Sequence, residues 1–193
     1  MLRAHQLDTD RAFVLVIDLQ EKLLPLIRGY EGILRASREL LEVVGVFGLP
    51  VLATEQYPKG IGRTHADLRP CLTAAGAKVI EKLTFSACGE PAVRKAMLAI
   101  DRPQVILLGI EAHVCVQQTA LDLRAMDYDV FVPADATGSR GRLDYEQALA
   151  RLRQEGAWVG SVESVLFELC HRCDTDRFRA MLEVIKAHPP GDA

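Results

Sequence analysis

Residues 105–116 have the sequence VILLGIEAHVCV and change structural period within a few positions. Residues 105–108 form a continuous apolar run, which is typical of a strand buried on both faces. In residues 116–123, apolar side chains instead repeat at helical spacing. Cys115 is therefore predicted at or just before the first turn of a helix, where unpaired backbone N–H groups and the helix dipole favour a thiolate. A nucleophilic cysteine is expected at such a position.

Similar apolar runs recur along the chain and predict a six-stranded sheet. The predicted strands are, in order, 13–17, 51–54, 77–82, 105–108, 128–133 and 157–159. Because helices separate most of these strands, parallel pairing with right-handed crossovers is expected, with helices on both faces of the sheet. We therefore predict a Rossmann-like, doubly wound, three-layer α/β/α fold, with a mostly parallel sheet in the order 3-2-1-4-5-6.

Length and composition are those of an ordinary globular protein. The 193 residues suit a single domain, with its core at about 12–186 and a flexible tail at 187–193. The net charge of -3 lacks the basic footprint of proteins that bind nucleic acid or anionic membranes, so a small-molecule substrate is expected. No apolar run approaches the ~20 residues that span a bilayer, and the first residues lack a signal-peptide pattern. A cytoplasmic protein is therefore expected.

Three chemically reactive side chains fall where predicted strands end. Asp18 follows the first strand, Lys82 ends the third, and Cys115 follows the fourth. Because the carboxyl ends of parallel strands share one edge, and strands 1 and 4 are neighbours in the predicted order, we expect these side chains to converge. Asp18 could then act as general base, Lys82 could hold the carboxylate and stabilise developing negative charge, and Cys115 could attack an electrophilic carbon. The backbone N–H groups of residues 110–115 could form an oxyanion hole.

Each of these residues also has an ordinary structural explanation. A cysteine in an apolar run is often a buried small hydrophobe, an aspartate after a strand often forms a turn or caps a helix, and a lysine there is often solvated. Cys170 and Cys173 match a redox or zinc Cys-x-x-Cys pattern, but no second pair completes a four-ligand site. We interpret them as residues at a helix end.

Several motifs between about Phe13 and Leu169 resemble the isochorismatase-like cysteine hydrolase superfamily. They are Asp18-Leu19-Gln20, Lys82, Gly109-Ile110-Glu111-Ala112-His113-Val114-Cys115-Val116, Asp135-Ala136-Thr137-Gly138-Ser139-Arg140 and Glu163-Ser164-Val165-Leu166-Phe167-Glu168-Leu169. Residues 54–60, TEQYPKG, are similar to the isochorismatase domain-containing protein subgroup. The resemblance implies the isochorismatase-like hydrolase fold and a homo-oligomer, either a dimer or a larger assembly.

The resemblance also implies a set of roles around the strand ends. Asp18, Lys82 and Cys115 would form a catalytic triad. The Ile110–Glu111 peptide would be cis, and the Glu111 and Cys115 amides would form the oxyanion hole. A cis peptide bond outside proline is a rare feature that is tolerated where it serves a site.

Two departures from the superfamily pattern bear on the chemistry. Nicotinamidases, one branch, bind zinc through an Asp-x-His motif and a later histidine. Here that run is Glu55-Gln56-Tyr57 and His65 is left in the loop, so neither a metal nor another cofactor is expected. Many members carry Thr-Asp where this chain has Ala112-His113. His113 is then either a replacement hydrogen-bond partner in the turn or a surface residue at the start of the helix.

Because Cys115 is kept, the resemblance implies hydrolysis of a C–N bond, in an amide or carbamoyl-like small molecule, through a covalent thioester. Cleavage of the vinyl ether of isochorismate is not supported. The predicted substrate contacts are Glu55, Gln56, Tyr57 and Phe85. Two alternatives stay open: a non-catalytic binding or scaffold protein that retains the fold, and a redox-active thiol protein. Fast alkylation of Cys115 well below pH ~8.5 is expected if its neighbours lower its pKa.

Overall fold

The computed structural model describes residues 6–189, and its centre is a seven-stranded parallel sheet. The strands are β1 (Ala12–Ile17), β2 (Val51–Gln56), β3 (Lys78–Lys82), β4 (Gln104–Ile110), β5 (Asp129–Pro133), β6 (Thr137–Gly138) and β7 (Trp158–Gly160). Their order is β3-β2-β1-β4-β5-β7, and β6 pairs with β4. The predicted order is confirmed, since β7 is the predicted sixth strand. The additional strand, β6, is only two residues long and lies between the fifth and sixth predicted strands.

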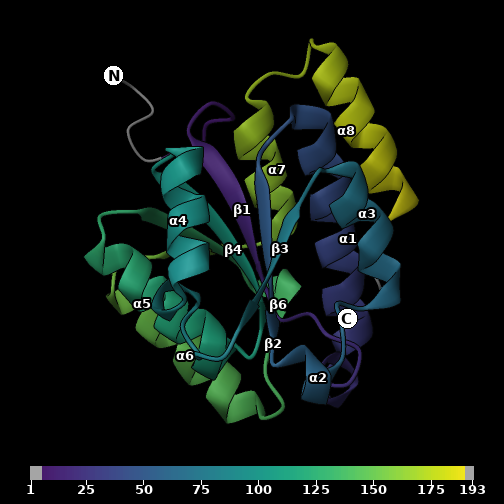
Figure 1. Ribbon diagram of the computed structural model, residues 1–193. Coiled ribbons are helices and arrows are strands. Elements are labelled where there is room, and N and C mark those ends of the chain that lie inside the picture. The colour runs from purple at the N-terminus through teal and green to yellow at the C-terminus, as the bar shows by residue number, and fades with distance from the viewer. Residues whose placement is uncertain (1–5, 190–193) are drawn as a thin grey trace.

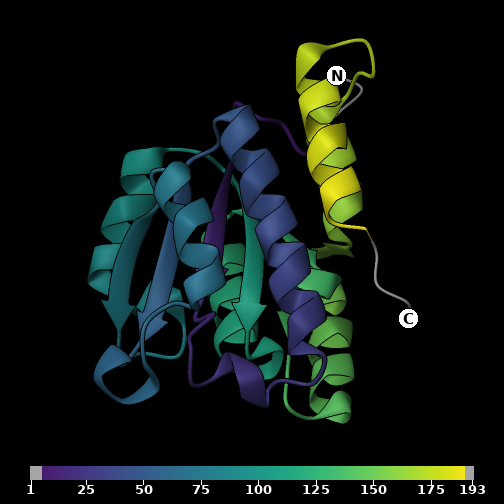
Figure 2. The same ribbon diagram turned by 90° about the vertical axis from the view of Figure 1, so that its right-hand side faces the viewer.

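Helices cover both faces of the sheet, so the predicted three-layer arrangement is confirmed (Figures 1 and 2). One face carries α1 (Tyr30–Phe47), α3 (Arg69–Ala74), α7 (Val162–Cys170) and α8 (Asp176–Ala187). The other face carries α4 (Pro91–Ile100), α5 (Gln117–Ala125) and α6 (Arg142–Gln154). The short helix α2 (Pro58–Ile61) follows the carboxyl end of β2.

Each face of the sheet has its own hydrophobic core. Along β1, Val14 and Val16 belong to the cluster under α1, whereas Phe13, Leu15 and Ile17 belong to the cluster under α4 and α5. Side chains alternate between the two faces of a strand, so a strand covered on both faces needs apolar residues at every position. This requirement explains why the central strands have continuous apolar sequences.

The strand register aligns the carboxyl ends at one edge of the sheet. Ile17 pairs with Thr54 on one side and with Gly109 on the other, and Gln56 pairs with Lys82. Gly109 has a φ of +124°, and a Cβ at this position would lie 2.0 Å from the carbonyl oxygen of Ile17. Only glycine therefore allows β4 to pass β1 this closely where both strands end.

The carboxyl-terminal region continues as helix α8 up to Ala187, the first residue of the predicted tail. His188 Nε2 lies 3.0 Å from Glu42 Oε2 on α1. The rest of the predicted tail at 190–193 lies outside the described residues. Within residues 6–189, no helix combines the length and apolarity needed to cross a membrane.

Candidate active site

The ends of β1 and β3 bring Asp18 and Lys82 together as a buried ion pair. Lys82 Nζ lies 2.7 Å from Asp18 Oδ2, and both side chains are 0% exposed. Thr54 Oγ1 donates to Asp18 Oδ1 over 2.8 Å. Apart from its contact with Lys82, Asp18 Oδ2 has no hydrogen-bond donor among the described residues. This oxygen can therefore accept a proton from a nearby group.

The Lys82 ammonium is held by neighbours besides Asp18. It donates to Gln56 Oε1 over 2.6 Å and to the carbonyl oxygens of Thr84 and Phe85, each over 3.1 Å. An ammonium has three N–H groups, so these acceptors and the Asp18 carboxylate satisfy it fully. The contacts fix the position of the charge and offset the cost of burying it.

Cys115 lies in a π-helical turn, residues Ala112–Val116, between β4 and α5. Its thiol is buried, and it interacts with both members of the ion pair. Burial, followed by the charge of Asp18, raises the pKa of Cys115 to about 12, and Lys82 offsets only part of this rise. A lowered pKa was the condition for fast alkylation below pH ~8.5, and it is not met, because burial and the carboxylate outweigh the ammonium. At neutral pH Cys115 is therefore a thiol that needs a base to take its proton.

The turn that presents Cys115 begins with an unusual peptide bond. The Ile110–Glu111 bond is cis, as the resemblance implied. The carbonyl oxygen of Glu111 accepts hydrogen bonds from the backbone N–H groups of Val114 at 3.1 Å and Val116 at 3.2 Å. An oxyanion hole formed by the Glu111 and Cys115 amides stays a prediction.

Three of the four predicted substrate contacts lie around Lys82. Gln56 binds the Lys82 ammonium through Oε1 and donates from Nε2 to the carbonyl oxygen of Leu83 over 3.0 Å. The side chains of Tyr57 and Phe85 are exposed, and so is that of Leu83, which the sequence reasoning did not single out. Tyr57, Lys82 and Leu83 contribute to the lining of a surface cavity of about 380 Å³. Apolar and aromatic groups thus lie next to the ion pair.

Glu55, the fourth predicted contact, does not join this group. Its carboxylate accepts from Arg63 at 2.9 Å and from the backbone N–H of Thr64 at 2.7 Å. Because side chains alternate along β2, Glu55 points to the opposite face from Thr54 and Gln56, the neighbours of the ion pair. We interpret Glu55 as the residue that anchors the loop after α2.

Gln20 is a structural residue of the site to which sequence reasoning gave no role. It is fully buried. Its Nε2 donates to the carbonyl oxygens of Gln56 at 3.0 Å and Gly62 at 2.6 Å, and its Oε1 accepts from the Gln56 N–H at 2.8 Å. The side-chain amide therefore joins the end of β1 to both ends of the α2 segment. Its place in the Asp18-Leu19-Gln20 motif was the available signal.

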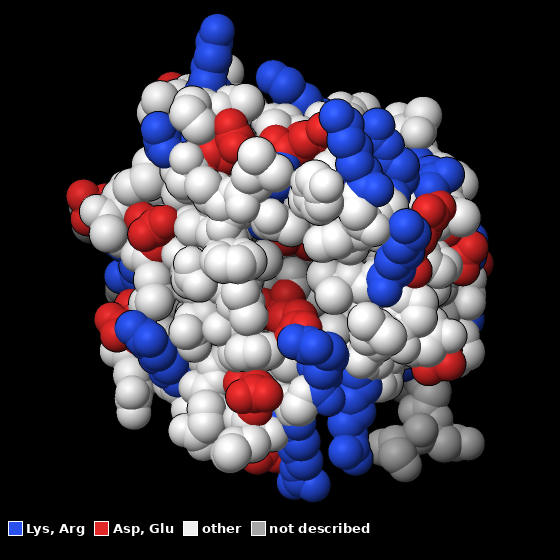
Figure 3. Space-filling model, turned by 60° about the horizontal axis from the view of Figure 1, so that its bottom comes forward, with Lys and Arg blue, Asp and Glu red and all other residues white. Residues whose placement is uncertain are grey.

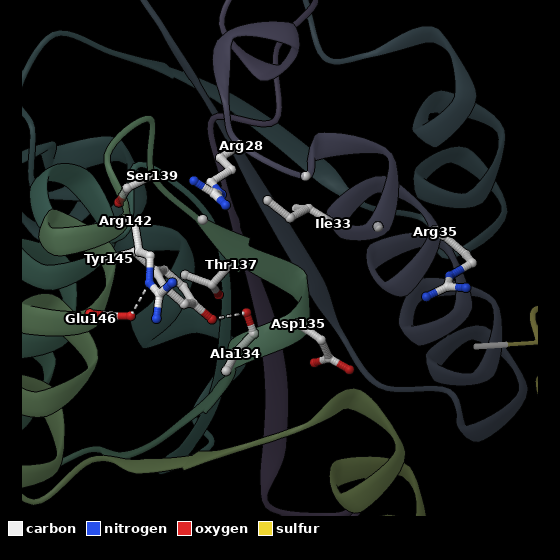
Figure 4. Close-up of a pocket in the computed structure, with 13 residues that line it drawn as sticks. Arg28, Ile33, Arg35, Ala134, Asp135, Thr137, Ser139, Arg142, Tyr145 and Glu146 are labelled. Carbon is white, nitrogen blue, oxygen red and sulfur yellow. Dashed lines mark hydrogen bonds and ion pairs between the residues drawn. The ribbon is translucent and has the colours of Figure 1, made fainter. Parts of the chain in front are cut away.

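A cavity larger than the one beside Lys82 lies between the start of α1 and residues 134–146 (Figure 4). Its volume is about 530 Å³. Arg28 and Arg142 approach it on one side, and Asp135 lies on the other. Asp18, Lys82 and Cys115 are not among its lining residues. The buried ion pair beside a thiol, rather than cavity size, therefore marks the candidate reaction site.

The face seen when the lower end of the molecule comes forward carries charges of both signs (Figure 3). Lys and Arg side chains project from it, and Asp and Glu side chains lie between them. Among residues 6–189, no group of three His, Cys, Asp or Glu side chains is arranged to hold a metal ion.

Comparison with known proteins identifies the family of this chain. The isochorismatase domain family model matches residues 12–164. The chain belongs to the isochorismatase family. Isochorismatase domain-containing protein 2 from Danio rerio is 36% identical over 187 residues, which cover 97% of this chain and 92% of that protein. Isochorismatase domain-containing protein 1 from the same organism is 36% identical over 90% of this chain, and the match spans 60% of that longer protein.

Solved structures of similar proteins share the isochorismatase-family hydrolase fold. A protein described as MAR1 ribonuclease from Caenorhabditis elegans has a TM-score of 0.90 and 33% identity, with 97% of each chain covered. YcaC from Escherichia coli, described as an octameric hydrolase of unknown specificity, has a TM-score of 0.90 and 27% identity over 96% of this chain and 91% of its own. YcaC from Pseudomonas aeruginosa, described with hexane-2,5-diol and covalent acrylamide, has a TM-score of 0.91 and 27% identity over 97% and 93%.

Proposed function

We propose that this isochorismatase-family chain is a cysteine hydrolase that cleaves the C–N bond of an amide or carbamoyl-like small molecule through a covalent thioester. One observation carries the proposal: a fully buried Asp18–Lys82 ion pair lies beside the Cys115 thiol, whose raised pKa keeps it protonated. A protonated thiol is a weak nucleophile, so a hydrolase of this kind needs a base next to the sulfur. Asp18 Oδ2 fits that role because it has no other donor than Lys82 among the described residues.

In the acylation step, Cys115 Sγ attacks the carbonyl carbon of the substrate while Asp18 takes the thiol proton. The π electron pair of the carbonyl moves to oxygen, and the Glu111 and Cys115 amides stabilise that negative charge. The C–N bond then breaks, and the nitrogen leaves with the proton that Asp18 had taken. Lys82 pairs with the Asp18 carboxylate and holds it in position.

In the second step, water attacks the thioester carbon and passes a proton to Asp18. The C–S bond breaks, and Asp18 returns that proton to the Cys115 sulfur. The acid product leaves, and the enzyme is restored. No metal or redox cofactor is required for either step.

Further support comes from the relatives and from the charge of the molecule. The Pseudomonas aeruginosa relative carries covalent acrylamide, a small electrophilic amide. The Caenorhabditis elegans relative is described as a ribonuclease. Here the net charge of -3 and the mixed charges in Figure 3 favour a small molecule over nucleic acid.

The remaining parts of the proposal concern substrate contacts and assembly. Gln56, Tyr57 and Phe85 are the proposed substrate contacts, since they surround Lys82. A single-domain, cytoplasmic homo-oligomer is proposed, and the octameric Escherichia coli relative supports the oligomer. Light scattering on the purified chain tests the oligomeric state.

The test of the chemistry uses 4-nitrophenyl acetate as an acylating probe, followed by a panel of small amides. We expect a burst of nitrophenolate, an acetyl group on Cys115 in the intact mass spectrum, and release of ammonia or amine from at least one amide. Cys115→Ala should abolish both reactions, and Asp18→Asn should slow them by roughly 10²-fold or more, the usual contribution of general-base catalysis.

Cys88→Ala is the matched control, because Cys88 is also buried and its pKa is also raised to about 12. This variant should keep both activities. A wild-type protein that is acetylated no faster than Cys115→Ala would refute the hydrolase proposal and favour a binding or scaffold role.

A further inference from the structure

The turn that presents Cys115 is braced from the side by the segment that follows β6. Strand β6 pairs Gly109 with Thr137 and Ile110 with Gly138, so the next residues of the two segments lie side by side. There, His113 Nδ1 lies 2.9 Å from Ser139 Oγ. His113 therefore links the turn to the segment after β6 through a hydrogen bond.

The second link between these segments is an ion pair to a buried carboxylate. Arg140 Nε donates to Glu111 Oε1 over 2.6 Å. The side chain of Glu111 is 7% exposed, whereas that of Arg140 is 63% exposed. Glu111 Oε2 has no hydrogen-bond partner among the described residues, and it lies 3.5 Å from His113 Nδ1. A buried carboxylate is costly unless it is paired, so Arg140 determines where the Glu111 side chain rests.

Glu111 is thus held at both its side chain and its backbone. The side chain is bound by Arg140, and the carbonyl oxygen accepts from the N–H groups of Val114 and Val116. In the proposed function, the remaining polar group of Glu111, its backbone N–H, binds the oxyanion. The peptide group that carries this N–H joins Ile110, which pairs with Gly138 of β6, to Glu111, so both of its ends are held and the N–H has little freedom to turn.

We infer that Arg140 is a positioning residue that fixes the Glu111 amide for oxyanion binding, assisted by the contact between His113 and Ser139. The inference rests on the proposed function. Arg140 binds the side chain of the residue that would stabilise the negative charge, so it acts through Glu111 rather than on the substrate. Its contribution should therefore appear in reactions that place negative charge on a carbonyl oxygen.

Two reactions of Cys115 separate this role from general support of the fold. Acetylation by 4-nitrophenyl acetate passes through a tetrahedral oxyanion. Alkylation by iodoacetamide does not, because sulfur attacks the CH₂ carbon and iodide leaves with the bonding electrons. Losing one oxyanion donor typically costs roughly 10²- to 10³-fold in rate. Arg140→Met should therefore slow acetylation by about 10²-fold and leave alkylation close to the wild-type rate.

Arg142→Met is the matched control, because Arg142 lies two residues further on and pairs with Glu146 instead of Glu111. This variant should keep both rates. Arg140→Lys retains a cation and should recover part of the acetylation rate. Hydrogen exchange of the amides of residues 111–116 provides a measurement that does not depend on activity, and it should accelerate in Arg140→Met alone.

Four outcomes are informative. Acetylation that is equally fast in Arg140→Met and Arg142→Met would overturn the inference. Equal losses of acetylation and alkylation in Arg140→Met would also overturn it, since they would indicate general damage to the turn. If the wild-type protein is not acetylated at all, the proposed function fails, and hydrogen exchange alone decides whether Arg140 braces the turn. Unchanged exchange in Arg140→Met would then overturn the inference, and faster exchange would support the bracing.

Discussion

Replacing Lys82 by methionine would leave Asp18 as a buried carboxylate without a counter-charge. The two charged groups are 2.7 Å apart, and both side chains are 0% exposed, so water cannot take over from the ammonium. Methionine is similar to the lysine stem in length and flexibility, so the change removes a charge with little loss of packing. The carbonyl oxygens of Thr84 and Phe85 would also lose a donor.

The expected magnitude follows from the burial of the pair. Removing one partner of a buried ion pair typically costs ~3–5 kcal/mol, because the other charge remains uncompensated. We expect Lys82→Met to lower the free energy of unfolding by about 4 kcal/mol. For a chain of this size, 1 kcal/mol corresponds to about 2–4 °C in Tm, so Tm should fall by roughly 8–16 °C.

Urea denaturation of a double-mutant cycle checks this reasoning. Asp18→Asn combined with Lys82→Met removes both charges and should recover much of the lost stability. Arg142→Met is the control, since it breaks an exposed pair with Glu146 and should leave stability nearly unchanged. A stability loss in Lys82→Met no larger than that in Arg142→Met would contradict this role of the ion pair, and so would a double variant as unstable as Lys82→Met alone.

Three further predictions concern the thiols and the Gln20 amide. Because burial and Asp18 raise the pKa of Cys115 to about 12, its alkylation rate should keep rising above pH ~8.5, where the rate of an ordinary thiol levels off. Peptide mass spectrometry of iodoacetamide-treated protein measures this rate at each pH. A plateau near pH ~8.5 would contradict the raised pKa. Burial raises the pKa of Cys88 to about 12, so the folded protein keeps the thiol proton at pH values where the unfolded chain has lost it. Above the pKa of the unfolded chain, stability therefore falls as pH rises. Cys88→Ala should remove about 1.4 kcal/mol per pH unit of that fall between about pH 9 and 12, as urea unfolding at several pH values would show. Gln20→Leu removes three hydrogen bonds at about 1 kcal/mol each, so it should destabilise the chain and accelerate hydrogen exchange at residues 57–62. Unchanged exchange there would argue against a role for the Gln20 amide in holding the α2 segment.

Most of the fold could be predicted from the sequence because the central strands are covered on both faces. Such strands have no polar positions, so the runs at 13–17 and 105–108 stand out from the helices around them. The strand order followed from the alternation of strands and helices. Strand β6 could not be predicted, because two residues carry no periodicity and its pairing with β4 is a tertiary contact. The single-domain division stays a prediction.

The residues of the candidate site could be predicted from the sequence, but the electrostatics of the site could not. Asp18, Lys82 and Cys115 follow strand ends, and topology alone brings such residues to one edge. The pKa of Cys115 could not be predicted, because it depends on how deeply the thiol is buried and on the balance between two neighbouring charges. The contacts of Glu55 with Arg63 and Thr64 could not be predicted either, because they depend on how the loop after α2 folds back onto β2.

The strand that carries Lys82 also limits the size of the sheet. β3 lies at one edge, and its outer backbone groups have no strand partner within the described sheet. Lys78 and Glu81 are exposed along this short strand, and charged side chains discourage another chain from adding a strand there. This five-residue strand therefore carries the buried ammonium of the candidate site and also protects an edge of the sheet. An apolar substitution at Lys78 or Glu81 would leave the buried ammonium unchanged, but it would allow another chain to pair with β3 and so promote aggregation.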